Sequence, residues 1–405
     1  HFSRERPEAG PCPHPHSRLS CQISGDFSRR RPLEIGRYSR SYEETAKDAE
    51  QKRMHERPSS YNMERFSRDA AGDRGHVWMP TPSIISNPAL AGYRLLREDC
   101  GRLALPTHAA IFLLGDDRKG WLQGQATQNV RSLDTGASTS FCFCEATGHL
   151  ITIADAWELG DRIALTVPRD TLDATLGRIE TMVILEDVVA EVADGHRLLS
   201  IQGPKASARL SEMFDLPKLD AGRVPFADTE ILVLRSNRTG MGGWDLWLPT
   251  IEAAQAIEAA FEEVSSEAYE IARLEAGIPE WGKDANGRTL PPELGSVFLP
   301  RHVSMNKGCY VGQEVLQRIH SRGHVNKVWM GLVADRPIPV GAKIAHLRRD
   351  DIGTVTSAAD SPDFGFIGAA VIRHEAAFDG EIVRIVTEEG TFDAEVRPMP
   401  LLRLG

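Results

Sequence analysis

Residues 307–314 combine side chains that can do chemistry. The segment Lys307-Gly-Cys-Tyr-Val-Gly-Gln-Glu314 places a cysteine between two glycines, beside a cation and a carboxylate. Glycine permits tight turns and the close approach of a ligand. Lys307 can favour the thiolate of Cys309, which is the reactive and metal-binding form of cysteine. The alternative is a turn with a small packing cysteine, which is the usual role of a lone cysteine.

A second group of polar residues follows this segment. Arg318, Arg322 and Lys327 form a local basic cluster in a chain whose formal net charge is -10. Such a cluster can bind an anionic group despite the acidic background. A solvated basic face is the alternative.

Two further patterns could indicate a metal site. His320 and His324 lie four residues apart, a spacing that suits a metal on a helix. Gly323 argues against a helix there, so we expect no metal site. Cys142 and Cys144 alternate as in a strand, but no second cysteine pair accompanies them. We therefore expect structural cysteines.

The elements that must position these residues mix strands, hairpins and helices. Ala109–Leu114 is an apolar run typical of a buried strand, and Thr171–Met182 suits a helix. Thr229–Arg235 and Trp244–Leu248 form a hairpin-like pair. Thr250 caps a following helix with one apolar face. This mixture predicts an α+β body over residues 86–326 rather than a doubly wound parallel sheet.

From about Lys327 the pattern changes to short strand-like runs separated by glycine and proline. Trp329–Val333, Gly353–Ser357 and Phe366–Ile372 are examples, and no helical period occurs among them. Such runs are typical of a small all-β barrel. We therefore expect a C-terminal β-barrel domain over residues 327–405.

Residues 1–85 differ in composition from the rest of the chain. They are rich in Arg, Ser, Pro and His and lack an apolar period, so we expect a disordered N-terminal extension. Residues 1–76 hold 15 Lys and Arg against 12 Asp and Glu, and the remainder holds 32 against 45. Twelve acids argue against a mitochondrial transit peptide, which favours a cytoplasmic protein over one of the mitochondrial matrix.

The sequence argues against direct binding of nucleic acid and against a membrane span. The acidic body disfavours direct binding of nucleic acid, because phosphate neutralisation needs a basic surface. No run of about 18 apolar residues occurs, so no membrane span is expected.

Four motifs resemble, in order, those of one protein family. Lys307–Glu314 matches the K-G-C-[FY]-x-G-Q-E signature of the YgfZ-type folate-binding proteins at every position. Trp121–Thr127 resembles F-L-Q-G-Q-x-T, and Arg273–Pro279 resembles R-x-E-A-G-I-P. Gly353–Ser357 resembles the G-x-V-T-S of a C-terminal barrel. These proteins are related to the T-protein of glycine cleavage, an aminomethyltransferase.

The resemblance implies a ring-like α+β folate-binding body with a C-terminal β-barrel domain, and tetrahydrofolate as the cofactor. A pterin presents two parallel donors, which one carboxylate accepts together. In the T-protein a hairpin glutamate does this. The matching stretch Arg238–Trp247, two residues shorter, places Trp244 and Asp245 on the corresponding positions. A solvent-facing strand position is the alternative for Asp245. The folate site would also include Gln125, Arg322, Gly312, Gln313 and Glu314.

One departure from the T-protein bears on the activity. A T-protein motif resembling N-E-A-G-G-I-L-D-D carries an aspartate that is essential to aminomethyl transfer. In the matching stretch Cys144–Thr152, Ile151 and Thr152 stand at the aspartate positions, and neither carries charge. The expected protein therefore binds tetrahydrofolate without transferring an aminomethyl group.

The role that the resemblance implies is help in the maturation or repair of iron–sulfur enzymes, and through them in tRNA modification. Cys309 would be the functional thiol, supported by Lys307. The partners would be iron–sulfur client enzymes or assembly factors. The alternatives are a tetrahydrofolate-dependent aminomethyltransferase and a protein-interaction scaffold.

Overall fold

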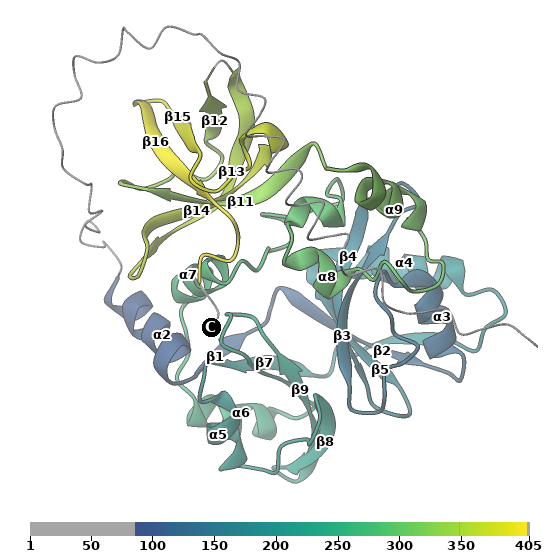
Figure 1. Cartoon of the computed structure of the whole chain (residues 1–405). Helices are drawn as coiled ribbons and strands as arrows, with labels where there is room; N and C mark the ends of the chain where they lie inside the picture. The colour runs from purple at the N-terminus through teal and green to yellow at the C-terminus, as the bar shows by residue number, and fades with distance from the viewer. Residues whose placement is uncertain (1–85, 348, 403–405) are drawn as a thin grey trace, which may run out of the picture. The chain divides into compact units, whose positions relative to one another are not determined.

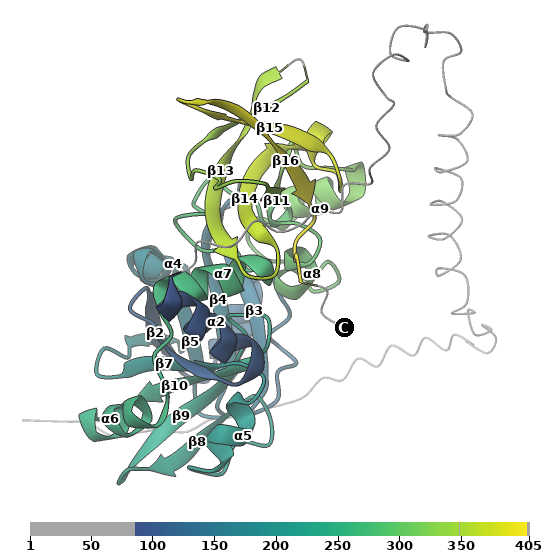
Figure 2. The ribbon, with the colours of Figure 1, turned by 90° about the vertical axis from the view of Figure 1, so that its left-hand side faces the viewer.

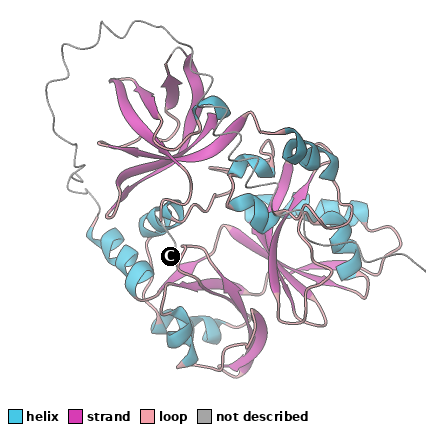
Figure 3. Cartoon of the chain, in the orientation of Figure 1, coloured by secondary structure: helices cyan, strands magenta, loops and turns pink. Residues whose placement is uncertain are grey.

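The computed structural model describes residues 86–347 and 349–402, without the Arg322 side chain. The expectation for residues 1–85 lies outside this part. The described residues form two antiparallel five-stranded sheets, a closed six-stranded barrel and the helices that cover and connect them (Figures 1 and 3). The α+β class with a C-terminal β-barrel is thus confirmed.

The first sheet has the strand order β3-β4-β5-β2-β6 and is apolar on both faces. Phe141 and Phe143 of β3 pack in a core with helices α3 and α4, whereas Cys142 and Cys144 face a second core that includes Tyr310. This alternation follows from the two-residue period of a strand. The bounds are β2 His108–Leu114, β3 Ser138–Cys144, β4 Leu150–Glu158, β5 Ile163–Pro168, β6 Val189–Val192, α3 Arg118–Gln125 and α4 Leu172–Met182.

The second sheet has the order β1-β7-β10-β9-β8 and lies against the first. Ile231 and Val233 of β9 pack with helices α5 and α6, whereas Leu232 and Leu234 pack with side chains of the first sheet. Thr250 caps α6 as expected, accepting from the Ala253 amide at 3.2 Å. The bounds are β1 Gly101–Ala104, β7 Arg197–Gln202, β8 Ala221–Phe226, β9 Thr229–Ser236, β10 Gly243–Leu248, α5 Ala206–Ser211 and α6 Ile251–Ala260.

The barrel closes in the order β11-β14-β13-β12-β15-β16, with β16 pairing back to β11. Its interior is apolar and includes Leu332, Ile344, Ile372 and Val396. The bounds are β11 Lys327–Ala334, β12 Lys343–His346, β13 Arg349–Ser361, β14 Gly365–Arg373, β15 Ile382–Thr387, β16 Gly390–Arg397 and the 3-10 helix η3 His374–Ala376.

Helices connect the second sheet to the barrel. Helix α7 contacts β13 of the barrel on one side and packs beside α2, with Ile271 and Leu96 in one core (Figures 1 and 2). The segment after α7 then returns to the first sheet before the barrel begins. The bounds are α2 Asn87–Glu98, α7 Ser266–Glu275, α8 Phe298–His302, α9 Gln313–Arg322, and the 3-10 helices η1 Arg169–Thr171 and η2 Pro291–Leu294.

Candidate functional site

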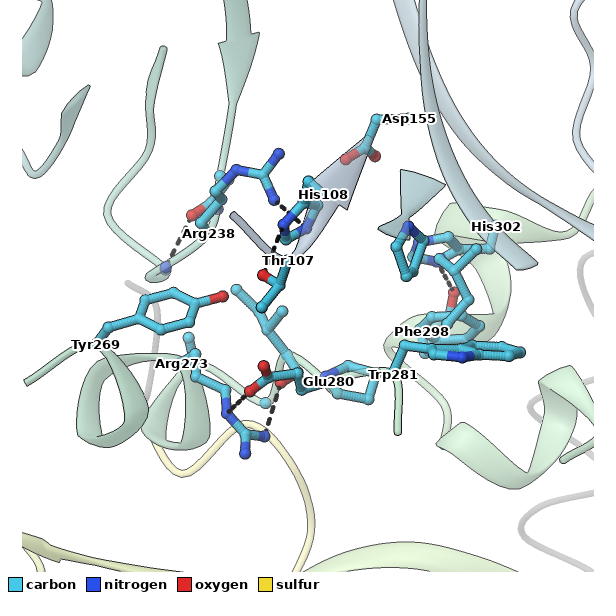
Figure 4. Close-up of a pocket in the computed structure, with 18 of the residues that line it drawn as sticks. Thr107, His108, Asp155, Arg238, Tyr269, Arg273, Glu280, Trp281, Phe298 and His302 are labelled. Carbon is cyan, nitrogen blue, oxygen red and sulfur yellow. Dashed lines mark hydrogen bonds and ion pairs between the residues drawn. The ribbon is translucent and has the colours of Figure 1, made fainter. Parts of the chain in front are cut away.

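A cavity of about 380 Å³ lies among β4 of the first sheet, the β9–β10 connection of the second, and the segment from α7 to α8. Small-molecule sites usually measure about 300–1,000 Å³, so the cavity can hold a compact ligand. Figure 4 shows charged and aromatic side chains from these elements around one space. The two sheets and the connecting helices thus surround the cavity, in agreement with the expected ring-like body.

Two histidines in the cavity wall are neutral at neutral pH. Burial, together with the nearby Arg238 guanidinium, lowers the pKa of His108 to about 3. Arg238 Nη1 lies 2.9 Å from His108 Nε2, so this nitrogen accepts and the ring proton is on Nδ1. Burial lowers the pKa of His302 to about 4, and its Nδ1 lies 2.9 Å from the Phe298 carbonyl. His302 therefore keeps Nε2 as an acceptor.

Asp245 does not line the cavity, which corrects the expectation that it faces the ligand. Its side chain is fully buried and forms a two-bond ion pair with Arg238, with a shortest N–O distance of 2.5 Å. Ser200 and Ser236 each donate to Oδ1 at 2.7 Å. The carboxylate therefore holds Arg238 in the wall.

The Trp244 side chain does not line the cavity either. Neighbouring residues of a strand point to opposite faces, and Trp244 is buried in the core beneath α5 and α6. Its Nε1 donates to Ser207 Oγ at 2.9 Å. Trp244 is thus a packing residue of the second sheet.

The carboxylate that does line the cavity from the first sheet is Asp155 of β4. Ser140 Oγ donates to its Oδ1 at 2.5 Å. Oδ2 has no hydrogen-bond partner among the residues that the structure describes. Asp155 therefore presents an oxygen with free lone pairs to the cavity. The sequence patterns above did not identify Asp155, although its charge interrupts the mainly apolar run Leu150–Trp157.

Aromatic faces complete the wall. Tyr269 of α7, Trp281 and Phe298 line the cavity, and Phe298 stacks on His302 with ring centres 3.8 Å apart (Figure 4). Flat aromatic ligands pack well against such faces. The cavity thus offers aromatic surface, neutral imidazoles and carboxylates to one ligand.

The signature segment 307–314 does not line this cavity. Cys309 is exposed and lies outside the cavity wall, and the Lys307 ammonium is directed to other groups. The Lys307 ammonium donates to the carbonyl oxygens of Gln123 at 2.7 Å, Gln128 at 3.0 Å and Ala126. These three bonds use its three hydrogens. Lys307 therefore fastens the signature loop to the C-terminal end of α3, and burial lowers its pKa to about 8.

Gly312 explains why glycine stands at one signature position. Its φ is +88°, and a Cβ there would lie 2.6 Å from the Glu145 carbonyl oxygen. The residue starts α9 against the turn between β3 and β4. Gln313 is half-buried in the first turn of α9, and Glu314 is exposed. None of the three lines the cavity.

The remaining predicted ligand residues also lie elsewhere. Gln125 of α3 is buried and does not line the cavity, and its Oε1 has no partner among the described side chains and backbone. The Arg322 side chain lies outside the described part. Arg318 and Lys327 do not line the cavity, where the cations are instead Arg169, Arg238, Arg273 and Arg301.

The residues at the T-protein aspartate positions are structural. Ile151 packs against the core beneath α3 and α4. Thr152 is fully buried, and its Oγ1 lies 2.6 Å from Thr171 Oγ1. Neither lines the cavity.

Comparison with known proteins identifies the family. A family model described as the GCVT N-terminal domain matches residues 38–307. The chain belongs to the GCVT N-terminal domain family. The tRNA-modifying protein YgfZ of Yersinia enterocolitica is 26% identical over 309 residues, which cover 74% of this chain and 91% of that protein. An aminomethyltransferase of Halothermothrix orenii is 25% identical over 326 residues, which cover 76% and 90%.

A solved aminomethyltransferase structure shares the fold. Aminomethyltransferase T of the glycine cleavage system from Bartonella henselae aligns over 78% of this chain and 89% of its own, with a TM-score of 0.68 and 20% identity. The GCVT-family chain is thus similar both to YgfZ proteins and to aminomethyltransferases. In residues 86–347 and 349–402, no helix is long and apolar enough to cross a membrane, and no three His, Cys, Asp or Glu residues are grouped to hold a metal ion.

Proposed function

We propose that this protein binds tetrahydrofolate in the cavity and assists the maturation or repair of iron–sulfur enzymes, in the cytoplasm and without aminomethyl transfer. The composition of the cavity wall supports the binding of folate. The wall combines the Asp155 carboxylate with the aromatic faces of Tyr269, Trp281 and Phe298. A reduced pterin needs a carboxylate at its paired donors and a flat surface beside its ring, so the wall fits the ligand.

In this proposal Asp155, and not Asp245, is the carboxylate that accepts the paired donors of the pterin. Asp155→Asn keeps the shape but removes the charge and replaces one acceptor by a donor. Loss of a charge-assisted hydrogen bond costs about 1.5–3 kcal/mol, so tetrahydrofolate affinity should fall roughly ten- to a hundredfold in calorimetric titration. Asp173→Asn is the matched control, because Asp173 is exposed and does not line the cavity. Equal affinities of wild type and Asp155→Asn would show that Asp155 does not meet the pterin.

The iron–sulfur part of the proposal rests on the resemblance of residues 307–314 to the YgfZ-type signature. The relatives named tRNA-modifying proteins support a role whose clients include tRNA-modifying enzymes. Cys309 is exposed at the signature loop, whereas Cys100, Cys142 and Cys144 are buried. We propose that a client or assembly factor meets Cys309 on this surface, outside the folate cavity.

Cys309 should therefore react with iodoacetamide much faster than the three buried cysteines. Burial raises the pKa of Cys100 to about 11 and that of Cys144 to about 12, and raises the pKa of Cys142 well above its usual value. Thiols react as thiolates, so these three should label slowly. Mass spectrometry of the labelled native protein measures the four rates.

The Cys309→Ser variant tests whether this thiol is used. It should fold and bind tetrahydrofolate like the wild type, since Cys309 does not line the cavity, yet it should fail to restore iron–sulfur enzyme activity in cells that lack the protein. Cys100→Ser is the control, because it removes a cysteine that is buried and cannot meet a client. Full rescue by Cys309→Ser would show that the Cys309 thiol is not needed for this activity.

The second candidate function is tetrahydrofolate-dependent aminomethyl transfer. Relatives named aminomethyltransferase match this chain about as well as those named YgfZ. Because Ile151 and Thr152 supply no carboxylate, we expect no transfer from an aminomethyl-lipoyl donor to tetrahydrofolate. Sustained turnover in that assay would favour the second candidate.

A further inference from the structure

The loop between α4 and β6, residues 183–188, exposes two large apolar side chains. Ile184 and Leu185 are 80% and 95% exposed, more than any other large apolar side chain of the described residues. The loop is nevertheless held in place, because Glu186 Oε2 accepts from both of their amides at 3.0 Å. Neighbouring apolar side chains that are held exposed together indicate a surface that meets a partner.

Helix α3 lies beside this loop and shows bare backbone to the outside (Figure 1). Trp121 Nε1 donates to the Met182 carbonyl at 3.0 Å, which joins α3 to the start of the loop. Gly120 and Gly124 are one helical turn apart, and a Cβ at either position would meet nothing within 4 Å. Glycine lowers the stability of a helix relative to alanine, and the fold does not need it at these two positions. The missing side chains let a partner helix approach the α3 backbone closely.

The carboxylates around α3 and the loop lack basic partners. Five acidic residues here are exposed and form no ion pair among the described residues: Asp116, Asp117, Glu180, Glu186 and Asp187. The basic side chains of α3 and α4 pair instead with Glu158 and Glu145. Unpaired acidic groups beside apolar ones favour a partner that is both apolar and basic.

The same surface continues to the signature loop. Lys307 Nζ donates to the carbonyl of Gln123 at 2.7 Å, in the last turn of α3. Gly308 and Cys309 follow directly and are exposed, and a Cβ at Gly308 would also meet nothing within 4 Å. A partner seated on α3 would therefore lie next to the loop that carries Cys309.

We propose that the exposed side of α3 and the loop 183–188 form a docking face for a basic amphipathic helix of a partner protein. The apolar side of that helix covers Ile184 and Leu185, its Lys and Arg side chains meet the carboxylates, and its backbone approaches Gly120 and Gly124. That the partner is an iron–sulfur client rests on the proposed function, whereas the docking face itself does not.

Fluorescence anisotropy with a labelled amphipathic peptide of leucine and lysine, about four helical turns long, tests the docking face. The double variant Ile184→Ser, Leu185→Ser should weaken binding about tenfold or more, because two apolar contacts are lost. Val340→Ser is the matched control, since Val340 is 63% exposed but lies between β11 and β12 of the barrel. Absence of peptide binding, or equal binding by wild type and the double variant, overturns the proposal.

A glycine variant tests the close approach to α3. Gly120→Leu should not lower the melting temperature, because the added side chain meets no atom of the fold, yet it should weaken peptide binding about tenfold or more. Gly195→Leu is the control, since Gly195 is equally open but lies beyond the far end of β6. Unchanged peptide binding by Gly120→Leu would remove α3 from the docking face and overturn the proposal as stated.

Two further measurements separate the docking face from the proposed function. If the Ile184, Leu185 double variant binds tetrahydrofolate normally but fails to restore iron–sulfur enzyme activity in cells, the partner is a client. If it loses the peptide but restores activity fully, the docking face stands and the client role at this face is rejected. Self-association of the wild type through Ile184 and Leu185, without peptide binding, would assign the face to a second copy and contradict the proposal.

Discussion

Replacing Asp245 with alanine should lower the free energy of unfolding by about 3–5 kcal/mol, because it leaves the Arg238 charge buried without its partner. Asp245 is fully buried, and four donor groups converge on its carboxylate from Arg238, Ser200 and Ser236. Chemical denaturation measures the loss. Asp335→Ala is the control, since the Asp335–Arg336 pair is exposed and should contribute at most about 1 kcal/mol.

The same pair predicts a dependence on pH. Burial alone would raise the pKa of Asp245, but the Arg238 charge and its hydrogen bonds outweigh burial and lower the pKa. A carboxyl group with a lowered folded pKa stabilises the protein above its unfolded pKa of about 3.9, and this contribution is lost as the pH falls through the folded value. Below about pH 4 the wild type should therefore lose stability more steeply than Asp245→Ala. Parallel pH profiles, or a cost below about 1 kcal/mol at neutral pH, would contradict this account of the pair.

Replacing Arg273 with methionine should also cost about 3–5 kcal/mol, since buried carboxylates lose their cation. Arg273 is fully buried in α7 and donates to Asp284 at 2.5 Å and to Ser357 of the barrel at 2.7 Å. Asp284 in turn accepts from Thr356 and Ser357 at 2.5 and 2.8 Å. Burial alone would lower the pKa of Arg273, but the Asp284 and Glu270 carboxylates raise it.

Lys283→Met provides the matched control for Arg273→Met. Lys283 pairs with Glu270 at 2.9 Å and Glu280 at 3.0 Å, but it is half-exposed. An exposed pair contributes about 0–1 kcal/mol, so denaturation should separate the two variants clearly. Equal and small losses would mean that the Arg273 network does not join α7 to the barrel.

This network gives a physical reason for two of the sequence motifs. Arg273 and Glu275 belong to the segment Arg273–Pro279, and both reach the barrel: Arg273 bonds to Ser357, and Glu275 accepts from Ser361 at 2.5 Å. Ser357 ends the motif Gly353–Ser357. The two motifs are thus partners in one buried contact, which no local pattern in the sequence could indicate.

Local patterns predicted the fold better than the site. Hairpin, cap and barrel signals depend on neighbouring residues, and β9, β10 and the Thr250 cap lie where these signals placed them. The strands β1, β6, β8 and β16 were not predicted, and the first two have only four residues each.

The site was harder because its residues come from distant segments. Asp155, Tyr269 and Trp281 meet only in the folded chain and share no motif. Asp245 does not line the cavity because Arg238, only seven residues earlier in the same hairpin, takes it as a buried partner. The specific signature 307–314 marks a loop docked on α3 and the β3–β4 turn, away from the cavity wall.

Titration of the purified protein with tetrahydrofolate tests whether the cavity is a folate site. We expect saturable binding of one molecule, weakened by Asp155→Asn and unaffected by Cys309→Ser, because Asp155 lines the cavity and Cys309 does not. Absence of binding, or binding that Cys309→Ser abolishes while Asp155→Asn leaves it intact, would contradict the assignment of the cavity as the folate site.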